Sequence, residues 1–198
     1  MKYPTETARE PDALAALRSA THSRHEELDS GLPIGAPDAS LSDYAAHLSM
    51  LRAWLAPLQD WLRTFDDGPQ CDAQFDQAGR LALIEQDLAE QGMPPASSGA
   101  AGVIGWPLDA SPAWRWGVCY VIEGSQLGGA VLYQRLHERL APHPLRYLKG
   151  ADTGPGPRWR AFMQALRAQV RSPQEILEAS AGACAAFDSI LALGMHRR

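Results

Sequence analysis

The stretch WGVCYVIEGSQLGGAVL, residues 116–132, carries four glycines inside a segment whose other residues favour an α-helix. Each glycine costs such a helix about 1 kcal/mol relative to alanine, so a compensating contact is expected. At 100° per residue, Gly117, Gly124 and Gly128 fall within about 40° of one another, and their face is a strip of bare backbone. The glycines alone leave two interpretations open: close packing of a second helix, or a flat ligand lying against the backbone.

The rest of the chain also has the periodicity of helices. Apolar residues recur three and four positions apart through most of the sequence, whereas the alternation typical of strands is almost absent. We therefore predict an all-α, multi-helical single domain over residues 1–198, with residues 1–9 flexible. The predicted helices cover about residues 11–28, 40–65, 72–90, 111–140 and 159–170, with a final helix after Ser172 and a long loop over 93–109.

Several helix starts carry recognisable capping residues. Ser111 precedes a proline, which is a favourable first helical residue because its missing N–H needs no partner there. Ser172 and Glu175 have the spacing of a capping box, in which each side chain accepts a hydrogen bond from the other residue's backbone N–H. A hydroxyl or a carboxylate within residues 40–43 is expected to cap the second helix.

Composition excludes several classes of protein. With 45% hydrophobic and 21% charged residues, the chain can bury a core and is not a disordered tail. Its net charge of −5 provides no field to attract nucleic acid or an anionic membrane surface. Cys71, Cys119 and Cys184 lie far apart and predict neither a disulfide framework nor a thiolate zinc site. With no signal peptide and no run of 18 apolar residues, we expect a cytoplasmic protein.

The predicted first helix holds a second group of reactive residues, LRSATHSRHEELD at positions 17–29. His25 falls inside the apolar stripe of the helix and His22 falls at its margin, so His25 is the better inward-facing ligand. Arg18 lies on the same face two turns earlier. Asp29 follows His25 by one turn, where it can accept a hydrogen bond from the second ring nitrogen. An inward-facing histidine is nevertheless more often a core residue than a metal ligand.

Other kinds of site match the sequence less well. The pattern Gly-Ser-x-x-Gly-Gly differs from the G-x-G-x-x-G phosphate loop, and no strand precedes it. A di-iron centre needs Glu-x-x-His pairs on two helices, and apart from one sequence near His22 no such pair occurs. Cys119 and Ser125 lack the strand-to-helix elbow that exposes a hydrolase nucleophile.

Two segments together resemble the motifs of the heme oxygenase family. LRSATHSRH, residues 17–25, is similar to the proximal-helix motif of that family, and YVIEGSQLGG, residues 120–129, is similar to its distal-helix glycine motif. The likeness is to the compact bacterial enzymes that supply biliverdin, including those associated with bacteriophytochromes. It covers about residues 10–193 and implies a helical bundle that holds heme between a proximal helix and a glycine-rich distal helix.

The resemblance assigns roles on both faces of the heme. His25 would be the axial ligand of the iron. Gly124 and Gly128 would let the distal helix cross directly over the other face, because they carry no side chains. Ser125 stands where many family members have an aspartate that orders distal water.

The resemblance also assigns residues that would orient the heme. Arg18 and Arg160 would each reach a propionate, Tyr120 would bind a propionate as well, and Phe187 would be an aromatic residue of the pocket. Since the propionate contacts decide which meso edge lies beneath the bound dioxygen, they would set the isomer of the product, which we expect to be the α isomer.

The implied activity is the O2- and electron-dependent cleavage of heme, at once substrate and cofactor, to biliverdin IXα, carbon monoxide and ferrous iron. A ferredoxin- or flavin-type reductase would supply the electrons, and a bacteriophytochrome is an expected recipient of the biliverdin. A site with a histidine ligand on one face of the heme and glycines on the other has no distal histidine or arginine. It therefore lacks the groups that promote early O–O cleavage. Two other functions stay open: a heme-binding carrier or sensor on the same fold, and a thiaminase-like or metabolite-binding protein, for which Cys119 is the candidate nucleophile.

Overall fold

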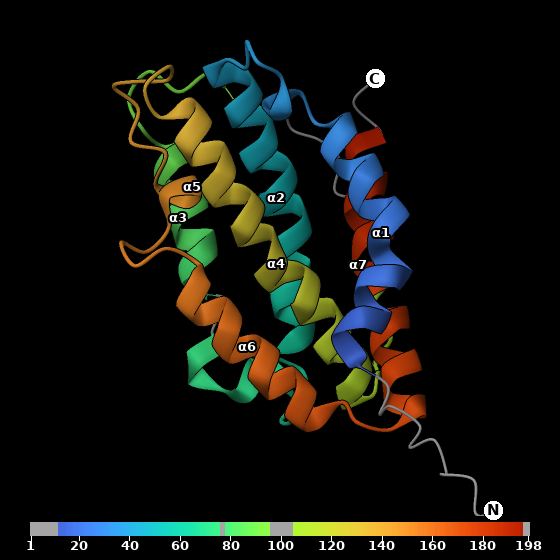
Figure 1. Cartoon of the computed structure of the whole chain (residues 1–198). Helices are drawn as coiled ribbons and strands as arrows, with labels where there is room; N and C mark the ends of the chain where they lie inside the picture. The colour runs from blue at the N-terminus through green and yellow to red at the C-terminus, as the bar shows by residue number, and fades with distance from the viewer. Residues whose placement is uncertain (1–11, 76–77, 96–104, 196–198) are drawn as a thin grey trace, which may run out of the picture.

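The computed structural model describes residues 12–75, 78–95 and 105–195 (Figure 1). No strand occurs in these ranges, so the predicted all-α architecture is confirmed. The predicted flexibility of residues 1–9 concerns a segment outside the described residues. In chain order the elements are α1 (Ala13–Gly31), η1 (Pro33–Gly35), α2 (Leu41–Leu62), η2 (Pro69–Cys71), η3 (Ala73–Phe75), α3 (Ala78–Leu88), α4 (Pro112–Leu136), α5 (Arg146–Lys149), α6 (Gly156–Gln169) and α7 (Pro173–Met195).

Within its first two turns α4 crosses α7, and two glycines let the helices touch backbone to backbone. A Cβ atom on Gly117 would overlap the Ala179 carbonyl and lie 2.8 Å from the Ala183 nitrogen. A Cβ atom on Gly182 would overlap the Trp114 carbonyl in the same way. Close packing of a second helix is therefore the correct interpretation at Gly117, the first glycine of the strip.

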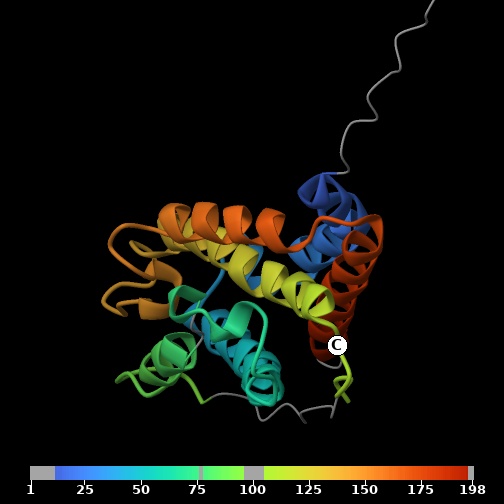
Figure 2. The same cartoon turned by 90° about the horizontal axis from the view of Figure 1, so that it is seen from below.

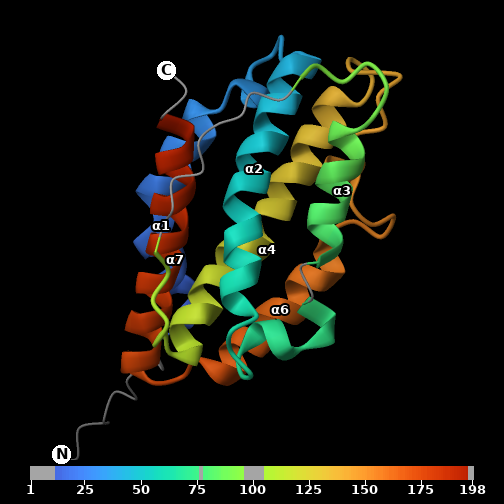
Figure 3. The same ribbon diagram turned by 180° about the vertical axis from the view of Figure 1, so that it is seen from behind.

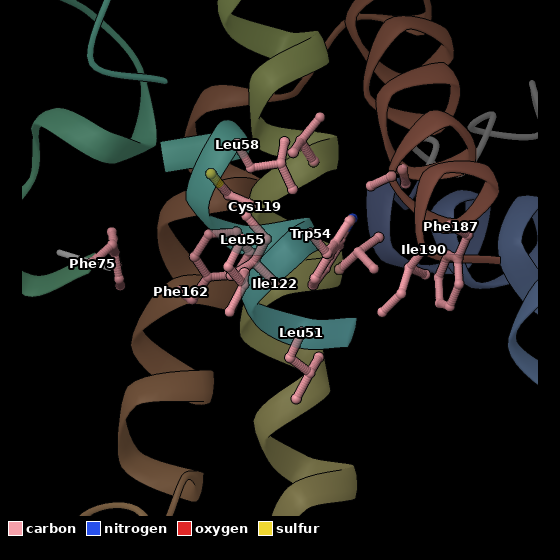
Figure 4. Packing of buried hydrophobic residues seen from close by; sticks show 14 of the residues in the cluster. Leu51, Trp54, Leu55, Leu58, Phe75, Cys119, Ile122, Phe162, Phe187 and Ile190 are labelled. Atoms are coloured by element: carbon pink, nitrogen blue, oxygen red, sulfur yellow. The ribbon is translucent and has the colours of Figure 1, made fainter. Parts of the chain in front are cut away.

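Several of the other helices pack against α4 or α7. Figures 1 and 3 show α1 lying alongside α7, and Figure 2 shows α6 running alongside α4. Leu55, Ile122 and Phe162 bring α2, α4 and α6 into one apolar core, as Figure 4 shows. The Trp54 indole of α2 donates a 2.8 Å hydrogen bond to the Ser189 hydroxyl of α7, so the one polar atom of this large side chain is paired within the core.

Local sequence signals set the starts of three helices. At α2, the Ser40 hydroxyl accepts a hydrogen bond from the Asp43 N–H (3.3 Å), and the Asp43 carboxylate accepts one from the Ser40 N–H (2.8 Å). Ser172 and Glu175 make the same reciprocal pair at α7. The Ser111 hydroxyl caps α4 by accepting from the backbone of its first turn. The predicted caps are confirmed in each case.

The predicted boundaries are wrong in the middle of the chain. Residues 69–75 form two 3-10 turns instead of the start of a helix, and α3 begins only at Ala78. Helix α4 ends at Leu136 rather than near residue 140, and α6 begins at Gly156, one turn before the expected start. The sequence does not predict helix α5, because four residues are too few to show helical periodicity.

Helix α7 is apolar along most of its length. Pro173–Gly194 is long and apolar enough to cross a membrane, and it is the one such helix in the described part of the chain. Ala179, Ala183 and Ala186 of this helix are completely buried inside the bundle. Packing against α4 and α1 therefore accounts for its composition.

Candidate functional site

A cavity of about 620 Å³ opens among α1, α2, α4 and α7, and single residues of α5 and α6 complete its wall. Cavities of roughly 300–1,000 Å³ are the usual size for small-molecule and cofactor sites. Apolar side chains form much of this wall, among them Met50, Leu51 and Trp54 of α2 and Ile190 of α7. The cavity therefore suits a large and mostly apolar ligand.

His25 enters this wall from α1 with its ring already oriented. Its Nδ1 lies 3.2 Å from Asp29 Oδ2, which is the contact predicted from their spacing. On the other side, the ring meets Phe187 of α7 edge-on, with centroids 5.8 Å apart. Because the carboxylate engages Nδ1, Nε2 is the nitrogen available to ligate a metal.

His22, predicted at the margin of the apolar stripe, also lines the cavity. Its Nε2 lies 3.4 Å from Glu26 Oε1, and its side chain is 74% exposed, against 62% for His25. The carboxylate of Glu26 thus engages Nε2 of His22, whereas the carboxylate of Asp29 engages Nδ1 of His25 and leaves its Nε2 available for a metal. His25 is therefore the better candidate ligand.

Gly124 and Gly128 of α4 face the cavity and not α7. A Cβ atom on Gly128 would have no neighbour within 4 Å, and one on Gly124 would make only ordinary contact with the Trp159 ring at 3.6 Å. Gly129 points to the other side, where Leu148 lies 3.8 Å away. The second interpretation, a flat ligand against bare backbone, therefore fits Gly124 and Gly128.

Arg18 and Tyr120 both line the cavity, close enough for the guanidinium charge to act on the phenol. Burial raises the pKa of the Tyr120 hydroxyl, and the charge of Arg18 opposes part of that rise. The phenol is therefore protonated at neutral pH. A guanidinium beside a phenol O–H offers several donors to a carboxylate.

Arg160 is not part of this wall. It is exposed, and its guanidinium lies beside Gly156 at the start of the same helix. The preceding residue, Trp159, faces the cavity and packs against Tyr120 with ring centroids 5.5 Å apart. Neighbours on a helix point about 100° apart, so Trp159 and Arg160 leave α6 in different directions. Arg18 is thus the one arginine or lysine that lines the cavity within the described ranges.

The lining residues that were not predicted from the sequence include Trp159, Tyr147 of α5 and His47 of α2. His47 bears on the expectation that the glycine-rich distal side has no histidine, because it lines the cavity as a further histidine beside His22 and His25. It precedes Met50 by three residues and Trp54 by seven, so the helical periodicity of α2 could have revealed it. The position of Tyr147 depends on α5, which has no such signal.

Ser125 follows the first cavity-facing glycine and directs its hydroxyl back to its own helix. Its Oγ donates a 2.8 Å hydrogen bond to the Ile122 carbonyl, which also accepts one from Arg80 Nη1 at 2.8 Å. The neighbouring Gln126 side chain donates to the Tyr147 hydroxyl at 3.0 Å. A group of polar side chains therefore surrounds α4 where its glycines face the cavity.

A buried ionic cluster holds the adjacent turn of α4 in place. The Glu123 carboxylate, with a side chain only 2% exposed, accepts hydrogen bonds from Arg80 of α3 at 2.7 Å and from Arg158 of α6 at 2.8 and 2.9 Å. Removing one partner of such a buried cluster would leave an uncompensated charge, typically at a cost of about 3–5 kcal/mol. The cluster therefore fixes Gly124 relative to α3 and α6.

Cys119 is not available as a nucleophile. It is 2% exposed and does not line the cavity. Burial, together with the charge of Glu123, raises the pKa of its thiol to about 12. Only the thiolate is nucleophilic, so the thiaminase-like alternative lacks its reactive group.

Comparison with known proteins agrees with this geometry. The family model described as heme oxygenase matches residues 12–193. The chain belongs to the heme oxygenase family. It is 34% identical over 143 residues to a protein named heme oxygenase from Xanthomonas campestris pv. campestris (strain 8004), a match that spans 71% of this chain and 79% of that relative.

A solved structure shares the fold. The crystal structure of the NO- and CO-bound heme oxygenase from Neisseria meningitidis superposes with a TM-score of 0.70, covering 93% of this chain and 91% of that one at 21% identity. At this identity the likeness speaks for the fold. The chemistry of the site follows from the residues of this chain.

The cavity residues fit a heme. His25 provides an imidazole nitrogen of the kind that ligates heme iron. Gly124 and Gly128 have no side chains, so they leave room for a flat macrocycle against the backbone of α4. Arg18 and Tyr120 supply donors for a propionate. The apolar remainder of the wall suits the porphyrin ring.

Proposed function

We propose that this protein binds heme with His25 as the axial ligand and cleaves it to biliverdin IXα, carbon monoxide and ferrous iron. The observation that carries the proposal is the meeting, in one cavity, of an oriented imidazole from α1 and the bare backbone of α4 at Gly124 and Gly128. Heme supplies the iron that binds dioxygen and the meso carbon that is oxidised. The protein supplies position and surroundings.

The residues on each side of the cavity have separate roles in this reaction. Asp29 holds the His25 ring so that Nε2 faces the cavity. Gly128 leaves the distal side open for dioxygen. Arg18 and Tyr120 hold one propionate, and the heme is thereby prevented from turning in its plane. This anchoring would place the α-meso edge at the site of oxidation.

We also propose the partners of the reaction. A ferredoxin- or flavin-type reductase delivers the electrons, and a bacteriophytochrome receives the biliverdin. The cytoplasm is the proposed compartment, and Cys71, Cys119 and Cys184, all free thiols, fit its reducing conditions.

Titration with hemin tests the binding step. Wild-type protein should give the Soret band of a histidine-ligated heme with one equivalent of hemin. His25→Ala should lose this spectrum, and imidazole added to the variant should restore it. His22→Ala is the matched control one turn earlier and should bind as wild type does. Loss of the spectrum in His22→Ala alone would contradict the assignment, and a stable complex that reductant and air leave intact would favour a heme carrier or sensor.

A further inference from the structure

Tyr147 is a buried phenol in the wall of the heme cavity. Its side chain is 3% exposed, and it reaches the cavity from α5, beside Ser125 of α4. Its oxygen accepts a hydrogen bond from the Gln126 amide at 3.0 Å. A phenol has one hydrogen to donate, and an amide N–H, which can only donate, does not consume it.

Ser125 is poorly placed to donate into the cavity. The hydrogen of its hydroxyl is directed to the Ile122 carbonyl at 2.8 Å. We propose that the Tyr147 hydroxyl is the hydrogen-bond donor to the ligand on the distal side of the bound heme. In this arrangement Gln126 fixes the phenol oxygen, and the phenol hydrogen points to the side that Gly124 and Gly128 leave open.

The backbone around Tyr147 is held as firmly as its side chain. Its N–H donates to Asp87 Oδ2 at 2.9 Å, and the same oxygen accepts a 2.6 Å hydrogen bond from the Tyr44 hydroxyl. Asp87 is completely buried, and its other carboxylate oxygen accepts from the Arg146 N–H at 3.1 Å. A donor held in this way is oriented before the ligand arrives, so it loses little entropy when it acts.

The charged and titratable groups near Tyr147 include Arg146 of its own helix and residues of three other helices. Burial raises the pKa of its phenol, so the hydroxyl keeps its proton at neutral pH, and the positive charge of Arg80 opposes part of the rise. The neighbouring groups of the other three helices are Arg80 and Asp87 of α3, Glu123 of α4, and Tyr44 and His47 of α2. Of these, only His47 also lines the cavity, so it is the rival donor.

The inference rests on the proposed binding of heme, and the experiment separates the two. Ferric heme complexes of wild type, Tyr147→Phe, His47→Phe and the control Tyr133→Phe are titrated with base and with fluoride. Tyr133 is a second tyrosine, on α4 itself, that does not line the cavity. Hemin affinity and the urea midpoint of each apoprotein are measured in parallel.

Tyr147→Phe should bind hemin within about twofold of wild type, since its ring is kept. Without the donor, hydroxide on the iron is less stable, so the pKa of the iron-bound water should rise by roughly one unit, and fluoride affinity should fall about tenfold. Tyr133→Phe should change neither quantity. Gln126→Leu should shift both in the same direction by less, because the phenol is then free to turn.

Unchanged water pKa and fluoride affinity in a heme-loaded Tyr147→Phe variant would overturn the assignment. A shift that His47→Phe reproduces in full would overturn it as well, because the imidazole would then be the donor. If wild type gives no Soret band at all, the proposed function itself fails, and the role of Tyr147 falls with it. The heme spectrum of the wild type and the ligand titrations of the variants thus report the two failures separately.

Discussion

Alanine substitutions at Gly117 and at Gly128, which each add one methyl group, distinguish the two interpretations of the glycine strip. At Gly117 the added carbon would overlap backbone atoms of α7, which cannot rotate away as a side chain could. Overpacking of this kind costs about 1–3 kcal/mol and occasionally more, while alanine returns about 1 kcal/mol of helix propensity. Since α4 and α7 must separate, we expect an overpacking cost of about 3 kcal/mol, at the upper end of that range. Less the gain in helix propensity, Gly117→Ala should lose about 2 kcal/mol of stability.

Gly128→Ala should have the opposite effect on the free energy of unfolding. A methyl group there meets no atom within 4 Å, so the variant gains about 1 kcal/mol of helix propensity without a clash. In a chain of this size, 1 kcal/mol corresponds to roughly 2–4 °C in Tm. The two apoproteins should therefore differ by about 3 kcal/mol, with Gly117→Ala below wild type and Gly128→Ala above it.

Urea unfolding of the apoproteins, followed by far-UV circular dichroism, measures the difference. Gly79→Ala is the control, because Gly79 lies on α3 away from the cavity with no atom within 4 Å of its added Cβ. It should gain stability as Gly128→Ala does and leave heme binding unchanged. Gly128→Leu should remain folded and block the oxygen chemistry by filling the distal space. If Gly117→Ala and Gly128→Ala were equally destabilised, or if Gly128→Leu turned over heme as wild type does, Gly117 and Gly128 would not have the separate roles of helix packing and ligand binding.

Other parts of the site give further predictions. Trp159→Ala should weaken hemin binding by about tenfold or more through lost apolar contact, measured by Soret titration, and an affinity equal to that of wild type would show that α6 does not cover the heme. Asp29→Asn should preserve binding but shift the iron–histidine stretching frequency in resonance Raman, because an amide is a weaker acceptor for His25 Nδ1–H. Hydrogen bonds from Ser40 hold the pKa of Asp43 below its ordinary value, so this carboxylate stabilises the fold above about pH 3.8 and loses its effect as the pH falls through its lowered pKa. Asp43→Asn should therefore be less stable than wild type at pH 7 and approach it under acid, as urea midpoints from pH 3 to 7 would reveal.

The helices that could be predicted are those whose ends and faces are encoded locally. Ser40, Ser111 and Ser172 cap their helices through residues three positions away, and such contacts are visible in the sequence. The segment before α3 and the short helix α5 depend on distant partners. The Asp87 carboxylate of α3, for example, holds the backbone of Tyr147, 60 residues further on. Local patterns contain no information about such a contact.

The candidate site divides in the same way. His25, Asp29 and Gly128 lie on two helices whose periodicity gives their directions, and the structure brings them to one cavity as expected. Arg160 was assigned by resemblance alone, and a difference of one position on α6 brings Trp159 to the cavity in its place. Gly117 shows that residues on one face of a long helix can meet different partners, because α7 crosses only part of that face.

A single-turnover reaction tests the proposed heme cleavage most directly. The stoichiometric hemin complex is given a ferredoxin reductase system in air, the Soret band is followed, carbon monoxide is trapped with myoglobin, and the pigment is separated by chromatography against the four biliverdin isomers. We expect loss of the Soret band with one carbon monoxide and one biliverdin IXα per heme, and no turnover in His25→Ala. A Soret band that persists, or that bleaches without carbon monoxide and biliverdin, would contradict the proposed function.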